Sequence, residues 1–342
     1  FFEAGPGPAE LSDAGLRVEV LPVGRLRQPH RWIAAVVRLA RLMRRRQPDL
    51  ILNWAAKTQL YGAPAAVLAG MADRVLWWQH GIPTGHWLDR CATALPAIAV
   101  GCSSHTAARA QAQLSPARPT FVVAPGARPP RTDSERASEP LSLELPPGVP
   151  VVGLVGRLEP WKGQDRLLSA HALLRERGHT VHTVVVGGDA YDLSPGYARS
   201  LPGLVERLDL AGAVTLTGQV PDAGPYIEQL DILVNASDCE PFGIVLLEGM
   251  ARGVAVVAVD SGGPAEYIEH GRTGMLARSG EPRALADALE PLLVSPGLRR
   301  AIGRAGWERF AEDFTDVAMR ARFFHHLEAL VGDRRDGRGA GV

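Results

Sequence analysis

The sequence contains no run of 18 or more apolar residues, although 46% of its 342 residues are hydrophobic. It therefore offers no stretch long enough to cross a membrane as a helix. It is also poor in cysteine, with only Cys91, Cys102 and Cys239, whose spacing is not that of a metal site. An odd number of widely spaced thiols favours a reducing, cytosolic compartment over a disulfide framework.

Two short motifs are absent as well. No G-x-G-x-x-G follows a predicted strand, which argues against a dinucleotide-dependent oxidoreductase. No Asp-x-Asp pair occurs, so we expect no metal site of that kind. Lysine is scarce, because only two of the 37 basic residues, Lys57 and Lys162, are lysines and the rest are arginines.

Short apolar runs alternate with helical patterns along the chain, which is typical of parallel sheets covered by helices. We expect an α/β protein with two Rossmann-like, doubly wound domains that face each other across a cleft. Strands are expected at 17–21, 50–53, 75–78, 97–100, 120–123, 151–155, 183–186, 214–217, 232–235 and 254–258, and helices at 32–46, 165–176, 242–252 and 282–293. The expected parts are an N-terminal domain at 1–131, a linker at 132–150, a C-terminal domain at 151–313, a closing helix at 314–331 and a disordered tail at 332–342.

The first candidate site follows the expected strand 151–155 and reads GRLEPWKG, residues 156–163. It contains two cations, Arg157 and Lys162. Ligands of open α/β sheets bind beyond the carboxyl ends of the strands. Two cations at such an end suit a diphosphate, which charge-assisted donors hold from more than one direction. Taken alone, the same spacing also fits a solvated basic loop.

The second candidate site follows the expected strand 232–235 and reads SDCEPFGIVLLE, residues 237–248. The N–H groups near residues 243–245 would begin a helix and form a phosphate site, and Gly243 would let a ligand approach the backbone closely. Carboxylates suit sugar hydroxyls better than phosphate, so we expect Glu240 to face a sugar and Glu248 a ribose. Helix capping by Glu240 and a surface position for Glu248 are the alternatives.

Two further motifs lie at strand ends. Gly262 and Gly263 follow the expected strand 254–258, where they fit either a phosphate-approach loop or only a tight turn. His80 follows the apolar run at 75–78 and falls at the ligand-binding edge of the first sheet. A histidine there serves either catalysis or a structural hydrogen bond.

The expected helix 32–46 has an apolar face and a strongly basic one. The apolar face consists of Ile33, Val36, Val37, Ala40 and Met43. The basic face consists of Arg38, Arg41, Arg44, Arg45 and Arg46. Such a basic face is typical either of a solvated surface or of weak peripheral contact with an anionic membrane.

In combination, the second half resembles the group-1 glycosyltransferases, the retaining family 4 with the GT-B fold. The resemblance covers residues 149–331 and rests on GRLEPWKG, EPFGIVLLE, SGGPAEYIEHGRTG and the VGG sequence at 186–188. The first half is similar more loosely, through RRRQPDLIL, WQHGIP and the strand before PG at 125–126.

The resemblance implies a role for each matching position. Arg157 and Lys162 match the pair that holds the donor diphosphate. Glu240 matches the glutamate that contacts the transferred sugar, and Glu248 the one that binds ribose hydroxyls. His80 matches a histidine near the reacting face of the sugar. The other donor-binding positions that the resemblance implies are Gly156, Gly187, Gly218, Val220, Phe242, Gly243, Ile244 and Val245.

Members of the family open with a strand and a Gly-rich loop, and we expect this sequence to begin after both. On that expectation, Phe1 and Phe2 form the end of a second strand, and the N-terminal domain lacks its first strand. Acceptor binding and part of phosphate binding would then be impaired, because the missing loop belongs to the acceptor side.

The resemblance thus implies a metal-independent transfer, with retention, of a sugar from a UDP- or GDP-sugar to an acceptor hydroxyl. The acceptor would be a carbohydrate, lipid or natural product. No cofactor besides this co-substrate and no nucleic-acid partner is expected, and the expected location is cytoplasmic, with peripheral contact at the inner face of the membrane as an option. A non-catalytic donor-binding fragment and a nucleotide-sugar epimerase of the same fold are the alternatives.

Overall fold

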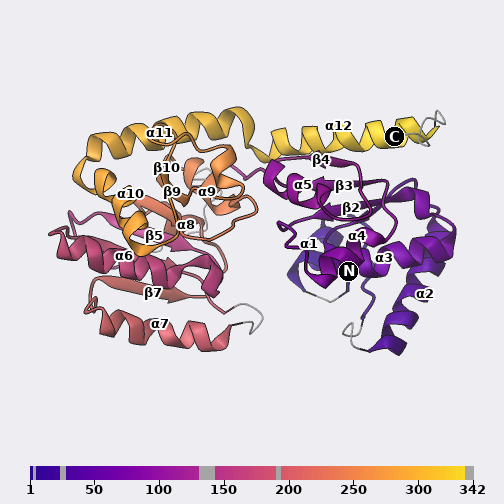
Figure 1. Ribbon diagram of the computed structural model, residues 1–342, viewed down its shortest axis with the longest axis horizontal. Helices are drawn as coiled ribbons and strands as arrows, with labels where there is room; N and C mark the ends of the chain where they lie inside the picture. Colours follow the sequence, from indigo (N-terminus) through magenta and orange to yellow (C-terminus); the bar gives the residue numbers. More distant parts are fainter. Residues whose placement is uncertain (3–4, 24–27, 131–142, 190–193, 336–342) are drawn as a thin grey trace. The chain divides into compact units, whose positions relative to one another are not determined.

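The computed structural model describes residues 1–2, 5–23, 28–130, 143–189 and 194–335. Contacts within the chain divide it into two compact units (Figure 1). Unit 1 comprises Phe1–Cys102, Ala107–Val122 and the end of the chain from Glu328, and unit 2 comprises Ser103–Thr106 and Val123–Leu327. None of the described helices is both long and apolar enough to span a membrane.

Unit 1 is built around a four-stranded parallel sheet with the strand order β1-β2-β3-β4. Its strands are β1 (Ile51–Asn53), β2 (Val75–Gln79), β3 (Ala99–Cys102) and β4 (Thr120–Val122). Its helices are α1 (Pro6–Asp13), α2 (Pro29–Arg46), α3 (Ala56–Ala69), η1 (Ala72–Arg74), α4 (Trp87–Ala94) and α5 (His105–Ala112). All five residues of β2 are buried, which is typical of a parallel strand covered on both faces.

The strand expected at residues 17–21 is wrong. The segment is extended but belongs to no described sheet, because its pairing is limited to one residue. The ammonium group of Phe1 donates a hydrogen bond to the carbonyl oxygen of Glu19 at 2.8 Å, and the N–H of Leu21 donates to the carbonyl oxygen of Phe1 at 2.7 Å. Phe1 and Phe2 are not in a strand either, and the ring of Phe2 instead packs 5.0 Å from that of Tyr61.

The helix expected at 32–46 is confirmed and begins earlier, at Pro29. Proline at a first helical position has a suitable φ and no N–H that needs a partner. The buried stripe of α2 runs through Val36 and Ala40 and packs against Tyr61 of α3. Ile33 was expected on this face but is 54% exposed, because it lies at the flank of that stripe.

Unit 2 contains a six-stranded parallel sheet with the order β10-β9-β8-β5-β6-β7. Its strands are β5 (Val151–Val155), β6 (His182–Val186), β7 (Val214–Gly218), β8 (Ile232–Asn235), β9 (Ala255–Val259) and β10 (Met275–Ala277). Its helices are η3 (Pro160–Lys162), α6 (Gln164–Glu176), α7 (Pro195–Arg207), α8 (Gly224–Ile227), α9 (Ile244–Met250), η5 (Pro264–Glu266), α10 (Pro282–Val294), α11 (Pro296–Asp313) and α12 (Asp316–Arg335), the last of which ends in unit 1. The strands expected from the sequence in this half are thus confirmed to within a residue at each end.

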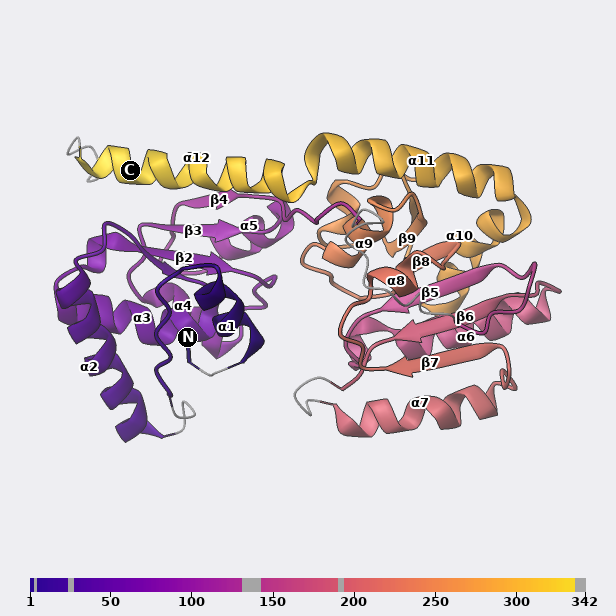
Figure 2. The same ribbon diagram turned by 180° about the vertical axis from the view of Figure 1, so that it is seen from behind.

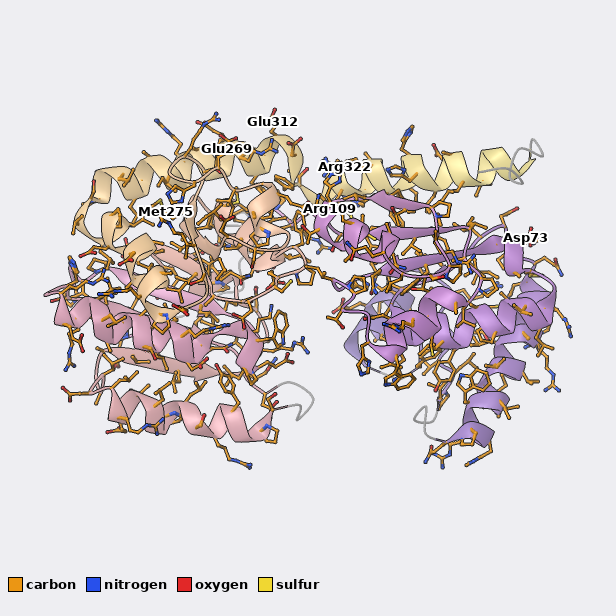
Figure 3. The ribbon with its side chains drawn as sticks, in the orientation of Figure 1. Asp73, Arg109, Glu269, Met275, Glu312 and Arg322 are labelled. Carbon is orange, nitrogen blue, oxygen red and sulfur yellow. The ribbon has the colours of Figure 1, made fainter. Side chains whose placement is uncertain are left out.

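Apolar side chains cover both faces of this sheet. On one face, Leu167 of α6 and Leu289 of α10 pack with Met275 of β10, which is labelled in Figure 3. Leu246 of α9 and Phe310 of α11 belong to the core of the other face. Figure 2 shows the ribbon turned by 180°. The arrangement confirms the expected layering of helices on both sides of a parallel sheet.

The strand order places a switch point beside β5. From β5 the chain moves to β6 and β7 on one side, then returns to β8 on the other side of β5. The connections after β5 and β8 therefore diverge to opposite faces of the sheet. Ligands of open α/β sheets bind at such points, beyond the carboxyl ends of the strands.

The start of the tail was expected too early, at residue 332. Helix α12 continues to Arg335, because one glycine costs a helix only about 1 kcal/mol and Asp and Arg are compatible with its last turn. Residues 336–342 of the expected tail and 132–142 of the expected linker lie outside the described residues. The expected domain limits stay predictions.

Candidate functional site

Three glycines meet at the carboxyl ends of β5, β6 and β7. The N–H of Gly156 donates to the carbonyl oxygen of Val186 at 2.9 Å, and the N–H of Gly187 donates to that of Gly218 at 3.1 Å. A Cβ at Gly187 would lie 2.0 Å from the carbonyl oxygen of Gly156, so a side chain there would force the backbone apart. The structure thus brings Gly156, Gly187 and Gly218 together at one edge of the sheet.

The GRLEPWKG loop after β5 holds its two cations beside an acidic and an aromatic side chain. Arg157 Nη1 lies 2.9 Å from Glu159 Oε1, and the indole N–H of Trp161 donates to the same carboxylate. Lys162 Nζ lies 4.0 Å from the centroid of the Trp161 ring, a distance at which the ring attracts a cation. The loop ends at Gly163, whose φ of 75° is in the left-handed region that favours glycine.

Glu240, in the loop after β8, is held by three donors at one oxygen. Its Oε2 accepts hydrogen bonds from the amide of Asn235 at 3.1 Å, the hydroxyl of Ser237 at 2.9 Å and the ammonium group of Lys162 at 2.7 Å. The side chain is only 10% exposed and that of Lys162 only 18%. Charges with so little water contact need partners of this kind.

Lys162 and Glu240 were singled out from different motifs with different expected partners, and the structure joins them directly. Lys162 follows β5 and Glu240 follows β8, so the ion pair spans the switch point of the sheet. A cation and a carboxylate therefore lie side by side where a ligand is expected.

Arg166 of α6 joins the same two loops. Its guanidinium donates to the carbonyl oxygens of Trp161 at 3.0 Å and Ala236 at 2.8 Å, and forms an ion pair with Asp238. The N–H of Asp238 also donates to the carbonyl oxygen of Trp161 at 3.2 Å. These contacts fix the separation of the loops that carry Lys162 and Glu240.

The loop after β9 packs against the loop of Glu240. The hydroxyl of Ser261 donates to the carbonyl oxygen of Asp238 at 2.7 Å, and the N–H of Gly263 donates to that of Glu240 at 2.8 Å. A Cβ at Gly262 would lie 2.2 Å from the carbonyl oxygen of Glu240. The glycine pair is therefore required for close backbone packing, and its phosphate contact stays a prediction.

Helix α9 begins at Ile244, two residues later than expected, and its N-cap is Gly243 with φ of 85°. No side chain caps it, so Glu240 does not have the alternative capping role. Tyr267 packs against the turn before α9. Its hydroxyl lies within hydrogen-bonding distance of the carbonyl oxygens of Phe242, at 3.1 Å, and Gly243, at 3.3 Å, and its ring stacks on that of Phe242. Burial, reinforced by the charge of Glu240, raises the pKa of Tyr267 well above its usual value.

Glu248 is half-buried on α9, and its expected ribose contact stays a prediction. Burial raises its pKa, Asp222 adds to this effect and Arg252 opposes it. Asp222 lies in the loop after β7, just beyond Gly218 and the partly buried Val220. The expected ribose and base positions thus belong to neighbouring elements of unit 2.

In unit 1, His80 directly follows β2, as expected. Its ring meets that of Trp54 edge-on, with centroids 5.0 Å apart, and lies 6.4 Å from that of Trp78. Burial lowers the pKa of His80, and a hydrogen bond with the Trp54 backbone partly offsets this effect. As a residue His80 is exposed, so we attribute the lowered pKa to the packed indole rings and not to an enclosed site. Its catalytic role stays a prediction.

Four residues that contact Arg157, Lys162 or Glu240 were not predicted: Glu159, Trp161, Asn235 and Ser237. Asn235 and Ser237 had a usable signal, because both are polar and lie at or just after the end of the apolar strand, five and three residues before Glu240. Glu159 and Trp161 lie inside the quoted motif, but a spacing rule for two cations says nothing about what orients them.

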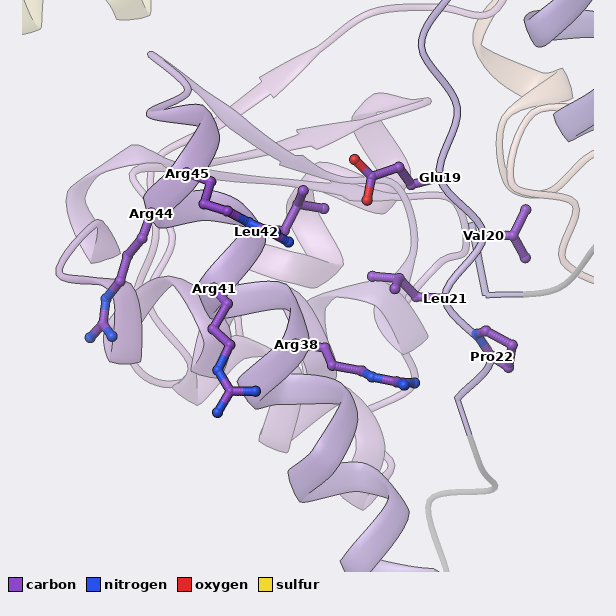
Figure 4. Close-up of a pocket in the computed structure, with 9 residues that line it drawn as sticks. All are labelled: Glu19, Val20, Leu21, Pro22, Arg38, Arg41, Leu42, Arg44 and Arg45. Atoms are coloured by element: carbon purple, nitrogen blue, oxygen red, sulfur yellow. The ribbon is translucent and has the colours of Figure 1, made fainter.

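A pocket between α2 and residues 19–22 belongs to unit 1 (Figure 4). Its lining residues are Glu19, Val20, Leu21, Pro22, Arg38, Arg41, Leu42, Arg44 and Arg45. Glu19 forms an ion pair with Arg46 at 2.9 Å. Within the part of the chain that the structure describes, Arg38, Arg41 and Arg45 form no ion pair or side-chain hydrogen bond. The described residues that line the pocket thus include four arginines and one glutamate.

Residues 136–309 match the family described as Glycosyl transferases group 1. The chain is 33% identical over 294 residues to a GDP-mannose-dependent alpha-(1-6)-phosphatidylinositol monomannoside mannosyltransferase of Mycobacterium tuberculosis, covering 80% of this chain and 74% of that protein. It is 35% identical over 230 residues to a D-inositol 3-phosphate glycosyltransferase of Nocardia farcinica, covering 63% of this chain and 50% of that protein. The chain thus matches about half the length of the latter relative.

Solved structures agree with this similarity. Anabaena Alr3699/HepE in complex with UDP and glucose is 25% identical with a TM-score of 0.79, covering 96% of this chain and 90% of that chain. Sucrose-phosphate synthase from Thermosynechococcus elongatus, at 22% identity and a TM-score of 0.74, supports the fold alone. It covers 92% of this chain and 83% of that chain. The expected GT-B type of fold is confirmed.

Proposed function

Because the chain belongs to the group-1 glycosyltransferases, we propose that it transfers a sugar from a nucleoside-diphosphate sugar to an acceptor hydroxyl, with retention and without a metal. The observation that carries the proposal is the Lys162–Glu240 pair at the switch point of unit 2. The pair provides a cation for the diphosphate and a carboxylate for sugar hydroxyls within one hydrogen bond of each other.

The leaving group is the part of the donor that the site is best equipped to hold. Arg157 and Lys162 supply two positive charges on one loop, and α9 begins after Gly243 without a side-chain cap. Preorganised donors of this kind stabilise the charge that develops on a departing diphosphate. In this proposal these cations take the place of a metal ion.

The transfer breaks the bond between the anomeric carbon and the diphosphate oxygen and forms one from that carbon to the acceptor oxygen on the same face. The electron pair of the broken bond stays on the diphosphate, and its departing oxygen accepts the proton of the acceptor hydroxyl. In this proposal Glu240, whose Oε2 accepts three hydrogen bonds, orients the sugar, and the departing oxygen is the base. His80 of unit 1 is assigned to the reacting face of the sugar.

The donor is proposed to be a UDP- or GDP-sugar, with Glu248 on the ribose and the backbone at Gly218 and Val220 on the base. The bound UDP of Alr3699/HepE and the GDP-mannose named for the mycobacterial relative support these two bases. Glu248 can accept a hydrogen bond from a ribose hydroxyl in either protonation state.

The test is incubation of the protein with a panel of nucleotide sugars and candidate acceptors, followed by mass spectrometry of all products. Transfer predicts a nucleoside diphosphate together with a glycosylated acceptor. Binding without any product would favour a non-catalytic donor-binding protein. An isomerised nucleotide sugar without release of nucleoside diphosphate would favour an epimerase.

We also propose weak peripheral contact of unit 1 with an anionic lipid surface, supported by the arginine-lined pocket along α2 (Figure 4). Each arginine near such a surface contributes about 1 kcal/mol, or about fivefold in affinity. The variant Arg41→Ala/Arg45→Ala should therefore sediment less with phosphatidylglycerol vesicles, while the exposed Arg304→Ala of α11 serves as control. Equal sedimentation of both variants with the wild type would rule the contact out.

A further inference from the structure

Trp54 is an exposed indole that a buried indole holds in place. It follows β1 directly and is 45% exposed. Its ring stacks on that of Trp78, with centroids 5.3 Å apart and an interplanar angle of 12°. Trp78 belongs to β2, is only 2% exposed and meets Phe121 of β4 edge-on at 6.2 Å. The exposed ring is therefore the outermost member of an aromatic cluster that reaches into the sheet.

The residues before Trp54 are fixed by buried amides. The side-chain N–H of Asn53 donates to Gln59 Oε1 at 2.7 Å, and the amide of Gln59 donates to the carbonyl oxygens of Ala92 and Pro96. A Cβ at Gly62 would lie 2.0 Å from Asn53 Oδ1, so the absence of a side chain at this position leaves room for the amide. On the other side of Trp54, the ring of His80 packs edge-on at 5.0 Å. These contacts give the Trp54 ring one defined orientation.

A single exposed apolar residue needs no explanation, but Trp54 differs from the other exposed tryptophans. Trp87 of α4 is 60% exposed and Trp307 of α11 is 49% exposed. Both lie on helices and neither stacks on a buried aromatic ring among the described residues. Trp54 lies instead at the carboxyl edge of a parallel sheet, which is where such sheets bind ligands.

An ordered indole with an exposed surface has a defined chemical preference. The ring presents a flat, electron-rich π face, which attracts positively polarised groups. The C–H groups on one side of a pyranose or cyclitol ring form a flat surface of this kind, while the hydroxyls lie around its rim. The adjacent imidazole of His80 provides a hydrogen-bonding group for one of those hydroxyls.

We propose that Trp54 is a platform for the acceptor, on which a pyranose or cyclitol ring of the acceptor stacks. The identification of the stacked ring as part of the acceptor rests on the proposed function, but the stacking itself is a property of unit 1 alone. It assigns the acceptor to molecules with a six-membered polyhydroxylated ring. It also assigns a positioning and specificity role to a residue that does not touch the reacting bond.

The test is saturation-transfer difference NMR of the full chain with two ring probes, methyl α-D-mannopyranoside and myo-inositol. The wild type is expected to transfer saturation to the ring C–H protons of at least one probe. Trp54→Ala should weaken the binding of that probe at least tenfold. Trp54→Phe should keep most of the affinity, because an aromatic face remains. Trp87→Ala is the matched control and should behave as the wild type.

Equal binding by Trp54→Ala and Trp87→Ala, or no binding of either probe by the wild type, would overturn the platform. In transfer assays Trp54→Ala should raise the acceptor KM at least tenfold, whereas Trp54→Phe should keep it near the wild-type value. If the wild type releases no nucleoside diphosphate from any nucleotide sugar, the proposed function fails, and a Trp54-dependent NMR signal still supports the stacking site. The two failures are therefore distinguishable.

Discussion

Lys162 Nζ lies 2.7 Å from Glu240 Oε2, across the point where the strand order of unit 2 reverses. Both side chains are largely buried, so neither charge can lose its partner without cost. A donor that carries both phosphate and sugar hydroxyls can contact the two groups at once while their mutual hydrogen bond is kept. In the proposed function the pair is a preformed contact at which both halves of a nucleotide sugar would meet.

The two glutamates are expected to differ in which ligand they affect. Glu240→Gln should weaken nucleotide-sugar binding about 10- to 150-fold, which corresponds to a charge-assisted hydrogen bond of about 1.5–3 kcal/mol. Its affinity for free nucleoside diphosphate should stay the same or increase, because Lys162 loses a competing anion. Glu248→Gln should weaken the binding of both ligands. Calorimetry with each ligand measures this, and an equal loss for both ligands in both variants would reverse the assignment.

Gly262 packs against the Glu240 loop, and Gly253, which has the same φ but no such contact, is its matched control. Both have φ of 67°, so alanine at either position costs about 1–2 kcal/mol from the left-handed backbone alone. A Cβ at Gly253 meets no atom within 4 Å, whereas one at Gly262 would lie 2.2 Å from the carbonyl oxygen of Glu240. Gly262→Ala should therefore lower the unfolding free energy by a further 1–3 kcal/mol, roughly the cost of overpacking, and also reduce donor affinity.

Urea unfolding and donor titration of the two variants check this prediction. Gly253→Ala should bind the donor as the wild type does. If Gly262→Ala also binds the donor normally, the backbone of Glu240 does not need its present position.

His171 makes the stability of unit 2 depend on pH. Burial on α6, where its Nδ1 lies 2.9 Å from Thr183 Oγ1, lowers its pKa to about 4 from a usual value of 6.5. Above pH 6.5 the histidine is neutral in the folded and the unfolded chain. As the pH falls towards 4, the unfolded chain takes up the proton first, so the unfolding free energy decreases by up to about 3 kcal/mol.

Urea unfolding of the wild type and His171→Gln at pH 7.5 and 4.5 measures this contribution. The variant should lose less stability between the two pH values, because the glutamine does not titrate. An identical loss in both proteins would show that His171 is protonated in the folded state or contributes nothing.

Much of unit 2 could be predicted because its signals are local. Each strand is a short apolar run, and the loops that carry Arg157, Lys162, Glu240 and Gly262 follow strand ends, so the place of these residues in the fold could be predicted. In unit 1 the strand at 17–21 was wrong, since alternation alone cannot report whether a neighbouring strand exists. Ile33 was placed on the buried face because a helical period leaves its phase uncertain by one residue.

The contacts inside the site could not be predicted from spacing. Nothing in the sequence indicates that Lys162, Asn235 and Ser237 all reach one oxygen of Glu240, because this depends on the register of β5 beside β8. The stack of Trp54 on Trp78 depends in the same way on the pairing of β1 with β2. Long-range contacts of this kind are properties of the fold and not of a motif.

The central claim is that Lys162 and its loop form the donor site, and calorimetric titration with UDP and GDP tests it most directly. Lys162→Ala and Arg157→Ala should each lower the affinity for the bound nucleoside diphosphate about 10- to 150-fold, for the loss of about 1.5–3 kcal/mol. Lys57→Ala changes the only other lysine, an exposed residue of α3 in unit 1, and should leave the affinity unchanged. Wild-type affinity in both Lys162→Ala and Arg157→Ala would contradict the account.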